Sequence, residues 1–481
     1  MKKKTTALFA TCGVLLAGAV AIDLWSRIGR GHPSTVPPPP PPPAVPINAS
    51  AQGQLHLGEL VTADVALMND FVPAGGPSEV FMRVDLVAQE VSGRARAPMA
   101  LAIVIDRSGS MAGEKIERAR ASAKELVGRL DENDRISVIS YATDVTVDLP
   151  LTAASSSERA RINRVIDQIF DGGGTNISGG LDAGLAELER ARSLGLNARI
   201  VLLSDGNANQ GIVEPRGLSH LAQDAHDRGI TVSSLGLGLD FNEDVMTMIA
   251  ESGGGTYHYI REASQITAAL DEEMRGLSAL AARKVLVKLN LAPGVSLAEV
   301  YGYGVAASNQ RGAVNEAIIP IGDMSSGSKR RIVVRLNLSA PAPGGVPIGT
   351  AGLEYAQAQD GTPASFGGSL AAVATQDQAA LIKGERPEVA ATVAAILAAE
   401  ARRSAAVEFS SGNRGAAMER INRNLIETRA KAKKYQSVEL FDQVKELEGA
   451  ASNVAQEDAN SDLGRDFVKS EKYKAHRVFA Y

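Results

Sequence analysis

Apolar runs alternate with amphipathic segments through the middle of the chain, from residue 99 to 281. The runs at 101–105 and 200–203 are rich in branched apolar residues, a pattern typical of strands buried on both faces of a parallel sheet. Segment 114–130 instead places its apolar residues at helical spacing. Strand and helix patterns then alternate up to a final helix at 263–280. This order predicts an α/β domain with a doubly wound, mostly parallel, Rossmann-like sheet.

The flanks of this domain show a different pattern, in which apolar and polar residues alternate one by one. The alternation occurs at 60–67 and 79–88 before the domain and at 284–291, 316–321, 330–338 and 352–358 after it. A period of two residues predicts half-buried strands, and two or three strands are too few to form a core alone. We therefore predict that the strands of 50–98 and 283–360 form one β-sandwich into which the central domain is inserted.

Helical spacing returns after residue 361. Apolar residues repeat every three or four positions in three segments of 385–450, and Pro387 suits the first position of a helix. These segments predict a C-terminal helical unit of about three antiparallel helices. Its second segment is basic, and we interpret those charges as a solvated face rather than as a site for an anionic partner. The tail, 451–481, mixes charged and aromatic residues and predicts no element.

The N-terminal segment, 1–30, begins with three lysines followed by a mostly apolar run over residues 5–24. We favour by a small margin an uncleaved membrane anchor over residues 5–24, and the pattern also fits a cleaved signal peptide with a site near Ala21. Both interpretations place the rest of the chain outside the cytoplasm, in the periplasm or at the cell surface. Seven consecutive prolines lie within residues 31–47, which predicts an extended spacer.

The composition and the absence of several motifs argue against some classes of function. The 481 residues carry a formal net charge of −5, which argues against a general nucleic-acid surface. The single cysteine, Cys12, allows no intrachain disulfide. The sequence contains no H-E-x-x-H, G-x-S-x-G or G-x-x-x-x-G-K-[ST] motif, and its six histidines show no ligand spacing. We therefore expect neither an enzyme nor a nucleic-acid partner.

Oxygen-bearing side chains follow the buried runs of the central domain. Asp106, Ser108 and Ser110 come directly after the first run and before a helix, the end of a strand where open α/β sheets bind ligands. Asp205 follows a second buried run, and Thr175 lies in a glycine-rich turn before another helix. Such hard oxygens suit Mg²⁺, Mn²⁺ or Ca²⁺. The first three residues alone are equally compatible with an ordinary loop and helix cap.

With all three stretches present in this order, the chain resembles the von Willebrand factor type A (VWA) domain family, and in particular secreted bacterial proteins of that family. The metal-ion-dependent adhesion site of the family consists of Asp-x-Ser-x-Ser, a distant Thr, and an Asp in a Ser/Thr-Asp-Gly turn. Carried over residue by residue, these positions are Asp106, Ser108, Ser110, Thr175 and Asp205, and none departs from the pattern. The resemblance implies a divalent cation, bound in part through water, with one open coordination position for a partner's Asp or Glu.

We therefore expect a metal-dependent protein-binding module that serves in adhesion or in organising an envelope complex. Two alternatives stay open. The protein could be a structural envelope protein whose metal site is vestigial. It could also be a hydrolase in which the metal activates water, although the sequence nominates no general base for that reaction.

Overall fold

A computed structural model of the protein describes residues 53–90, 98–192, 196–205, 208–239, 241–262, 265, 268–269, 280–305, 307–308 and 315–480. The predicted signal peptide or anchor, the proline-rich spacer, Cys12 and nearly all of the helix predicted at 263–280 lie outside these residues. Within the described part, no helix combines the length and apolar character needed to cross a membrane.

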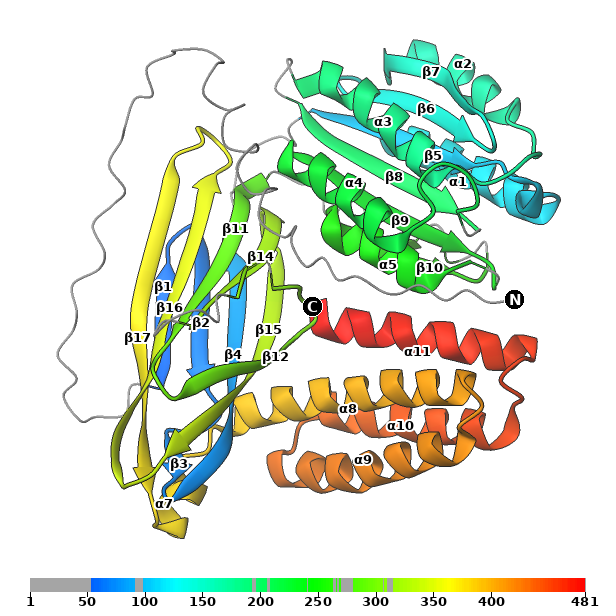
Figure 1. Ribbon diagram of the computed structural model, residues 1–481. Coiled ribbons are helices and arrows are strands. Elements are labelled where there is room, and N and C mark those ends of the chain that lie inside the picture. Colours follow the sequence, from blue (N-terminus) through cyan, green and yellow to red (C-terminus); the bar gives the residue numbers. More distant parts are fainter. Residues whose placement is uncertain are drawn as a thin grey trace, which may run out of the picture. The chain divides into compact units, whose positions relative to one another are not determined.

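The central domain is built on a six-stranded sheet with the strand order β10-β9-β8-β5-β6-β7 (Figure 1). Its strands are β5 (Met99–Asp106), β6 (Arg135–Tyr141), β7 (Val145–Ala153), β8 (Asn197–Ser204), β9 (Ile230–Leu237) and β10 (Gly254–Ile260). Only β7, at one edge, runs antiparallel to its neighbour. Every residue of β5 and β9, two of the four inner strands, is buried. The predicted doubly wound, mostly parallel sheet is therefore confirmed.

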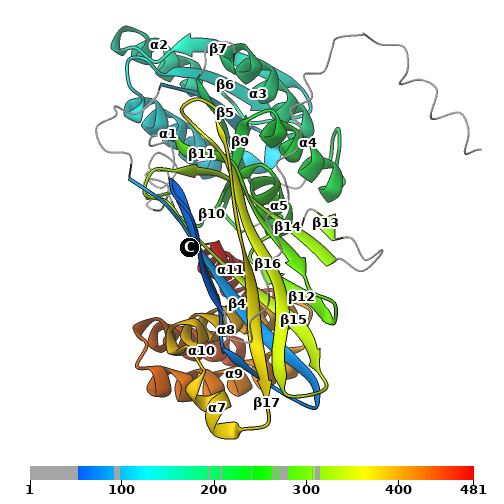
Figure 2. The ribbon, with the colours of Figure 1, turned by 90° about the vertical axis from the view of Figure 1, so that its left-hand side faces the viewer.

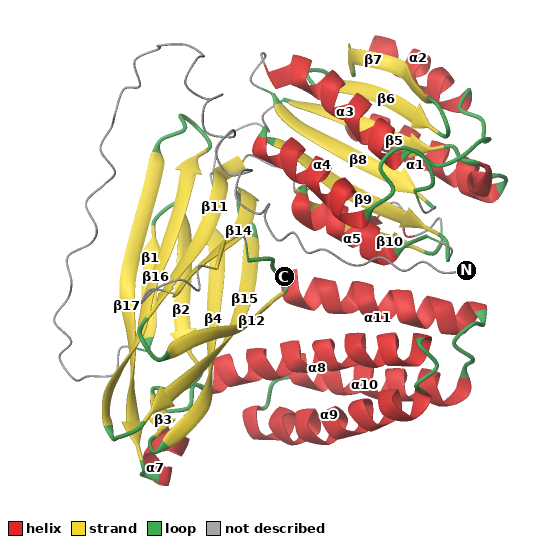
Figure 3. Cartoon of the chain, in the orientation of Figure 1, coloured by secondary structure: helices red, strands yellow, loops and turns green. Residues whose placement is uncertain are grey.

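Helices cover both faces of this sheet (Figure 3). One face packs against α1 (Glu114–Arg129) and α2 (Ser156–Asp167), and the other against α3 (Ile177–Arg192), α4 (Pro215–Asp227) and α5 (Glu243–Ser252). Both faces of β5 are thus apolar, which explains its unbroken hydrophobic run. Helix α3 approaches closely because Gly180 has no side chain; a Cβ there would lie 2.6 Å from the Tyr141 ring.

Strands that precede and follow the central domain in the sequence form a β-sandwich (Figure 2). One sheet has the order β1-β2-β4-β15-β12 and the other β13-β14-β11-β16-β17-β3. Their bounds are β1 (Gln54–Gly58), β2 (Val61–Leu67), β3 (Phe71–Pro73), β4 (Gly76–Ala88), β11 (Leu280–Leu291), β12 (Val295–Tyr301), β13 (Ala307–Ser308), β14 (Asn315–Ser325), β15 (Lys329–Ala340), β16 (Gly344–Gln357) and β17 (Pro363–Thr375). Strand β4 pairs with β15 along its length, and the central domain lies between β4 and β11 in sequence. The predicted insertion is confirmed.

Strand β17 extends the sandwich beyond residue 360, which was its predicted end. Exposure alternates along the whole strand, but fully buried positions occur only from Leu370 onward. Many of its residues are Gly, Ala or Ser, so little apolar periodicity marks it. Backbone pairing with β16 along nearly its whole length stabilises this strand instead.

The C-terminal helical unit, also confirmed, contains a short α7 (Gln378–Lys383) followed by α8 (Pro387–Ser410), α9 (Arg414–Tyr435), α10 (Val438–Gln456) and α11 (Asp462–Ala480). Pro387 opens α8 as predicted. Helix α8 packs through Val389 and Val393 against Val333 of the sandwich. Helix α11 occupies the tail, where the sequence predicts no element. The helix was not predicted because charged residues such as Lys469 and Glu471 lie on its buried face.

Candidate metal centre

Two neighbouring strands of the central sheet end in acidic residues at the same edge. Strands β5 and β8 are paired in parallel register up to Ile105 and Leu203, so Asp106 lies beside Ser204 and Asp205 follows directly. The Asp106 carboxylate is fully buried, and both of its oxygens accept hydrogen bonds. The Ser204 hydroxyl donates to Oδ2 at 2.6 Å and the backbone N–H of Ser108 to Oδ1 at 2.8 Å.

The two serines connect this strand end to the second acid. Ser108 Oγ lies 3.0 Å from Ser110 Oγ, and the Ser110 hydroxyl donates to Asp205 Oδ1 at 2.9 Å. Ser108 and Asp205 are almost completely buried, whereas Ser110 is exposed. The structure therefore brings together four of the five predicted residues: Asp106, Ser108, Ser110 and Asp205.

Thr175 reaches the same edge through its loop. The backbone N–H of Gly109 donates to the Gly173 carbonyl at 3.0 Å, which holds the Thr175 loop against the serine turn. Gly173 has a φ of +90°, a conformation that favours glycine. The Thr175 N–H donates to Asn209 Oδ1 at 2.8 Å, and its side chain is buried. The contacts of the described residues include no side-chain hydrogen bond from Thr175 to the other four residues.

Burial dominates the electrostatics of the site. It raises the pKa of Asp106, and the negative charge of Asp205 raises it further, while the hydrogen bonds from Ser204 and Ser108 act in the opposite direction. Burial and the neighbouring Asp106 charge also raise the pKa of Tyr141 well above 10, so this phenol stays protonated. Two acidic residues held in one buried site attract a cation, because a positive charge offsets the cost of burying their carboxylates.

A cationic side chain of the protein itself is already present. The ammonium of Lys115, in the first turn of α1, forms an ion pair with Asp205 Oδ2. Lys115 was not among the residues predicted from the sequence, although a lysine at a helix N-terminus is unusual because the helix dipole disfavours a cation there. Asn209 was not predicted either, because its contact depends on the fold and not on a recognisable spacing. Ser204 is the Ser/Thr position of the Ser/Thr-Asp-Gly turn, but its hydrogen bond to Asp106 was not predicted.

The donor set fits a hard divalent cation. Ligand oxygens that are adjacent in a Mg²⁺ octahedron with bonds of about 2.0–2.1 Å lie about 2.9 Å apart. The distances from Ser110 Oγ to Ser108 Oγ and to Asp205 Oδ1, 3.0 and 2.9 Å, match that spacing. Among the described residues, no group of three or more His, Cys, Asp or Glu side chains is placed to hold a metal ion. A site here therefore depends on hydroxyl ligands, which suit Mg²⁺, Mn²⁺ or Ca²⁺ and not Zn²⁺.

Comparison with known proteins assigns the central domain. Residues 100–272 match the von Willebrand factor type A domain family. The chain is therefore a VWA-domain protein, and a VWA domain is generally a protein-binding module.

The chain is also similar to two bacterial proteins over regions longer than the VWA domain. The uncharacterized protein YfbK of Escherichia coli (strain K12) is 31% identical over 231 residues, which are 47% of this chain and 40% of that protein. The uncharacterized protein sll0103 of Synechocystis is 29% identical over 304 residues, 61% of this chain and 70% of that protein. The chain thus spans less than half of the length of YfbK.

A solved structure shares the fold beyond the central domain. The von Willebrand factor type A protein from Catenulispora acidiphila is 18% identical, has a TM-score of 0.62, and covers 83% of this chain and 91% of its own. At this low identity the likeness shows the fold alone.

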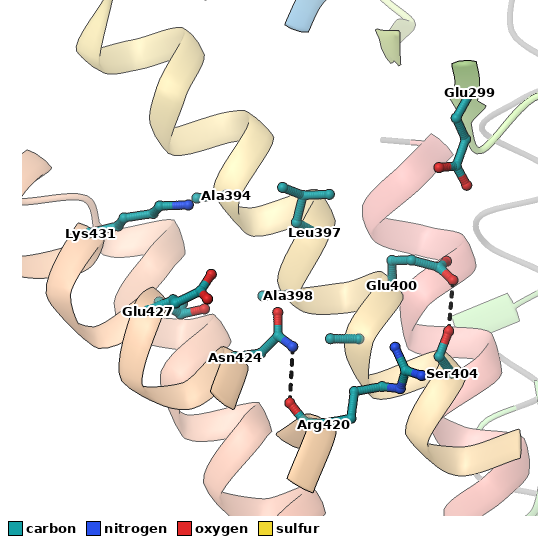
Figure 4. Close-up of a pocket in the computed structure, with 12 residues that line it drawn as sticks. Glu299, Ala394, Leu397, Ala398, Glu400, Ser404, Arg420, Asn424, Glu427 and Lys431 are labelled. Carbon is teal, nitrogen blue, oxygen red and sulfur yellow. Dashed lines mark hydrogen bonds between the residues drawn. The ribbon is translucent and has the colours of Figure 1, made fainter. Parts of the chain in front are cut away.

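A pocket of about 280 Å³ lies between α8 and α9 (Figure 4). Its lining includes Glu400 and Ser404 from α8 and Arg420 and Asn424 from α9. These polar groups bind neighbouring protein groups: Ser404 donates to Glu400 at 2.9 Å, Asn424 to the Arg420 carbonyl at 2.9 Å, and Arg420 to Glu408. Because these three polar side chains are already engaged by groups of the protein, we do not assign a ligand to this pocket.

Proposed function

We propose that the VWA domain binds a partner protein through a divalent cation, Mg²⁺ or alternatively Mn²⁺ or Ca²⁺. Asp106, Ser108, Ser110, Thr175 and Asp205 would hold the ion directly or through water. When bound, the cation would act as a Lewis acid that accepts a carboxylate oxygen from an Asp or Glu of the partner. The biological role would be adhesion or the organisation of an envelope complex.

The observation that carries this proposal is the chain of oxygens from Ser108 through Ser110 to Asp205, with separations of 3.0 and 2.9 Å. Only two of the five proposed ligands are anionic, so they leave a divalent ion without excess negative charge around it. The neutral hydroxyls thus favour recruitment of a further anionic ligand from outside.

The surroundings of the site support a protein ligand. Phe170 is 68% exposed and precedes Thr175 in the same loop, while Ile212 and Val213, both more than 40% exposed, follow Asp205. Among the described residues of the central domain, Val147 is the one other large apolar side chain that is classed as exposed. These three exposed apolar side chains lie on the segments that carry Thr175 and follow Asp205, and exposed apolar side chains are common at protein-interaction sites.

We also propose that the protein is not an enzyme and that it works outside the cytoplasm. The segment 5–24 would anchor it in the cytoplasmic membrane, or cleavage near Ala21 would release it. Both proposals rest on the sequence. A structural protein with a vestigial metal site remains the alternative, and absence of metal binding would favour it.

Isothermal titration of the folded protein with Mg²⁺ tests the metal centre. The parent should bind one ion, and Asp106→Ala and Ser110→Ala should lose measurable binding. Ser157→Ala is a matched control, because Ser157 Oγ lies 3.0 Å from Ser155 Oγ in an exposed serine pair outside the site. Absence of Mg²⁺, Mn²⁺ and Ca²⁺ binding by the parent would overturn the proposal.

The protein ligand requires a second measurement. Immobilised protein should capture a partner from envelope extract in Mg²⁺, release it in EDTA, and fail to capture it as Asp106→Ala. Chemical conversion of the carboxyl groups in the extract to amides should abolish capture. Capture that survives both EDTA and Asp106→Ala would contradict a metal-bridged contact.

A further inference from the structure

Lys115 and Asp205 form a charge pair inside the proposed metal centre. The Lys115 ammonium contacts Asp205 Oδ2, while Oδ1 of the same carboxylate accepts the Ser110 hydroxyl at 2.9 Å. The Asp205 side chain is 0% exposed and that of Lys115 is 28% exposed. Both oxygens of this buried carboxylate are thus engaged by groups of the protein itself.

The start of a helix is an electrostatically unfavourable place for the Lys115 ammonium. Lys115 lies in the first turn of α1, where the exposed N–H groups of the helix carry partial positive charge. Its stem passes Gly238 at the end of β9, where a Cβ would lie 3.4 Å from Lys115 Cε. A buried, unpaired Asp205 carboxylate would be costly, so the ion pair stabilises the arrangement as a whole.

We propose that Lys115 is a resident counter-cation of the site, which neutralises Asp205 in the metal-free protein and which a divalent ion must displace or share. This inference rests on the proposed function. Asp106 and Asp205 contribute two negative charges and Lys115 one positive charge. The protein therefore opposes metal binding with its own cation, and Lys115 sets how much free metal is needed to fill the site.

Replacement of the Lys115 ammonium by an apolar group tests whether Lys115 competes with the metal for Asp205. Lys115→Met keeps the stem, removes the competing charge and should raise Mg²⁺ affinity about tenfold or more. Lys115→Arg keeps the charge and should stay close to the parent. Lys124→Met is the matched control, because Lys124 lies on the same helix but pairs with Asp167 where both side chains are exposed.

Thermal unfolding gives an independent readout. In EDTA, Lys115→Met should unfold at a lower temperature than the parent, because the buried Asp205 carboxylate then loses its ion pair with Lys115. Saturating Mg²⁺ should recover most of this loss, so that the metal raises the unfolding temperature more in Lys115→Met than in the parent. Lys115→Gln, which is polar and uncharged, provides the same comparison if the methionine variant does not fold.

The outcomes distinguish this inference from the proposed function. Equal Mg²⁺ affinity in parent and Lys115→Met would overturn the counter-cation while leaving the metal centre intact. Weaker binding by Lys115→Met would also overturn it, since Lys115 would then assist the metal. Absence of binding in both proteins, with unfolding temperatures unmoved by Mg²⁺, would overturn the metal centre itself.

Discussion

The ammonium of Lys469 on α11 lies 2.6 Å from Glu243 Oε2 at the start of α5 and 2.6 Å from the Phe241 carbonyl oxygen. It also lies 4.1 Å from the centre of the Phe241 ring. Lys472, one turn further along α11, contacts the other Glu243 oxygen at 2.7 Å. Contacts of α11 thus tie the C-terminal helical unit to the VWA domain through charged side chains that are largely buried.

The Glu243 pairing makes stability depend on pH. Burial alone would raise the pKa of Glu243, but the hydrogen bonds and charges of Lys469 and Lys472 outweigh it and lower this pKa from 4.5 to about 2. A lowered pKa adds stability that is fully present above pH 4.5 and is lost as the pH falls through 2. A shift of this size corresponds to about 3 kcal/mol in the free energy of unfolding.

Glu243→Gln should therefore flatten the acid limb of the stability curve. Denaturant unfolding between pH 2 and pH 6 should show the parent gaining about 2–3 kcal/mol more stability than the variant as the pH rises. Asp244→Asn is the control, because Asp244 also pairs with Lys472 but is 73% exposed, and it should change the curve little. Parallel curves for parent and Glu243→Gln would contradict the pairing.

A second buried pair lies inside the helical unit. The Arg402 guanidinium, 1% exposed, contacts the carboxylate of Glu471, 3% exposed, at 2.5 Å and Gln443 at 3.0 Å. Arg402→Met leaves Glu471 buried without its main partner and should lower the free energy of unfolding by about 3–5 kcal/mol. The double variant Arg402→Met with Glu471→Leu should recover most of this loss.

The neighbouring residue supplies the control for that experiment. Arg403 pairs with Glu400 one turn away, and its side chain is 44% exposed. Arg403→Met should cost about 1 kcal/mol or less in denaturant unfolding. If Arg402→Met and Arg403→Met were equally mild, the buried pair would not contribute to stability as argued.

The fold was predictable wherever apolar periodicity reported burial. β4 and β15 alternate because each has one face in the sandwich core, so both strands were recognisable from sequence. Their mutual pairing was not, since it joins segments about 250 residues apart and no local pattern encodes it. β17 and α11 were not predicted because they lack the apolar periodicity that marks β4 and β15. Small residues in β17 and charged side chains in α11 occupy buried positions that usually carry large apolar ones.

In the candidate site, too, some residues were predictable from the sequence and others were not. Asp106, Ser108 and Ser110 form a compact motif, and strand ends in a parallel sheet converge. Their grouping with Asp205 around one cation, however, was expected from the resemblance to the VWA family and not from the local pattern alone. Lys115 was missed because the direction of a long flexible side chain depends on what surrounds it in the fold.

Asn209 offers a test of how the Thr175 loop is positioned. Its side-chain oxygen accepts the Thr175 N–H at 2.8 Å, and its own N–H donates to the Thr175 carbonyl at 3.0 Å. Asn209→Ala removes the side-chain contact and should weaken Mg²⁺ binding about tenfold in calorimetric titration, as loss of an outer-shell contact typically does. Asn242→Ala, which removes the N-cap of α5 instead, should lower stability and leave Mg²⁺ affinity unchanged.

Phe170 tests whether the exposed apolar residues near the site recognise the partner. Phe170→Ser removes a 68% exposed ring from the Thr175 loop and should reduce Mg²⁺-dependent capture of the partner at least fivefold. Calorimetric Mg²⁺ affinity should stay at the parental value, because the Phe170 side chain supplies no oxygen ligand. Val147→Ser, at a 39% exposed position on the edge strand β7, should leave both measurements unchanged. Undiminished capture by Phe170→Ser would assign recognition to the metal and the remaining loops alone.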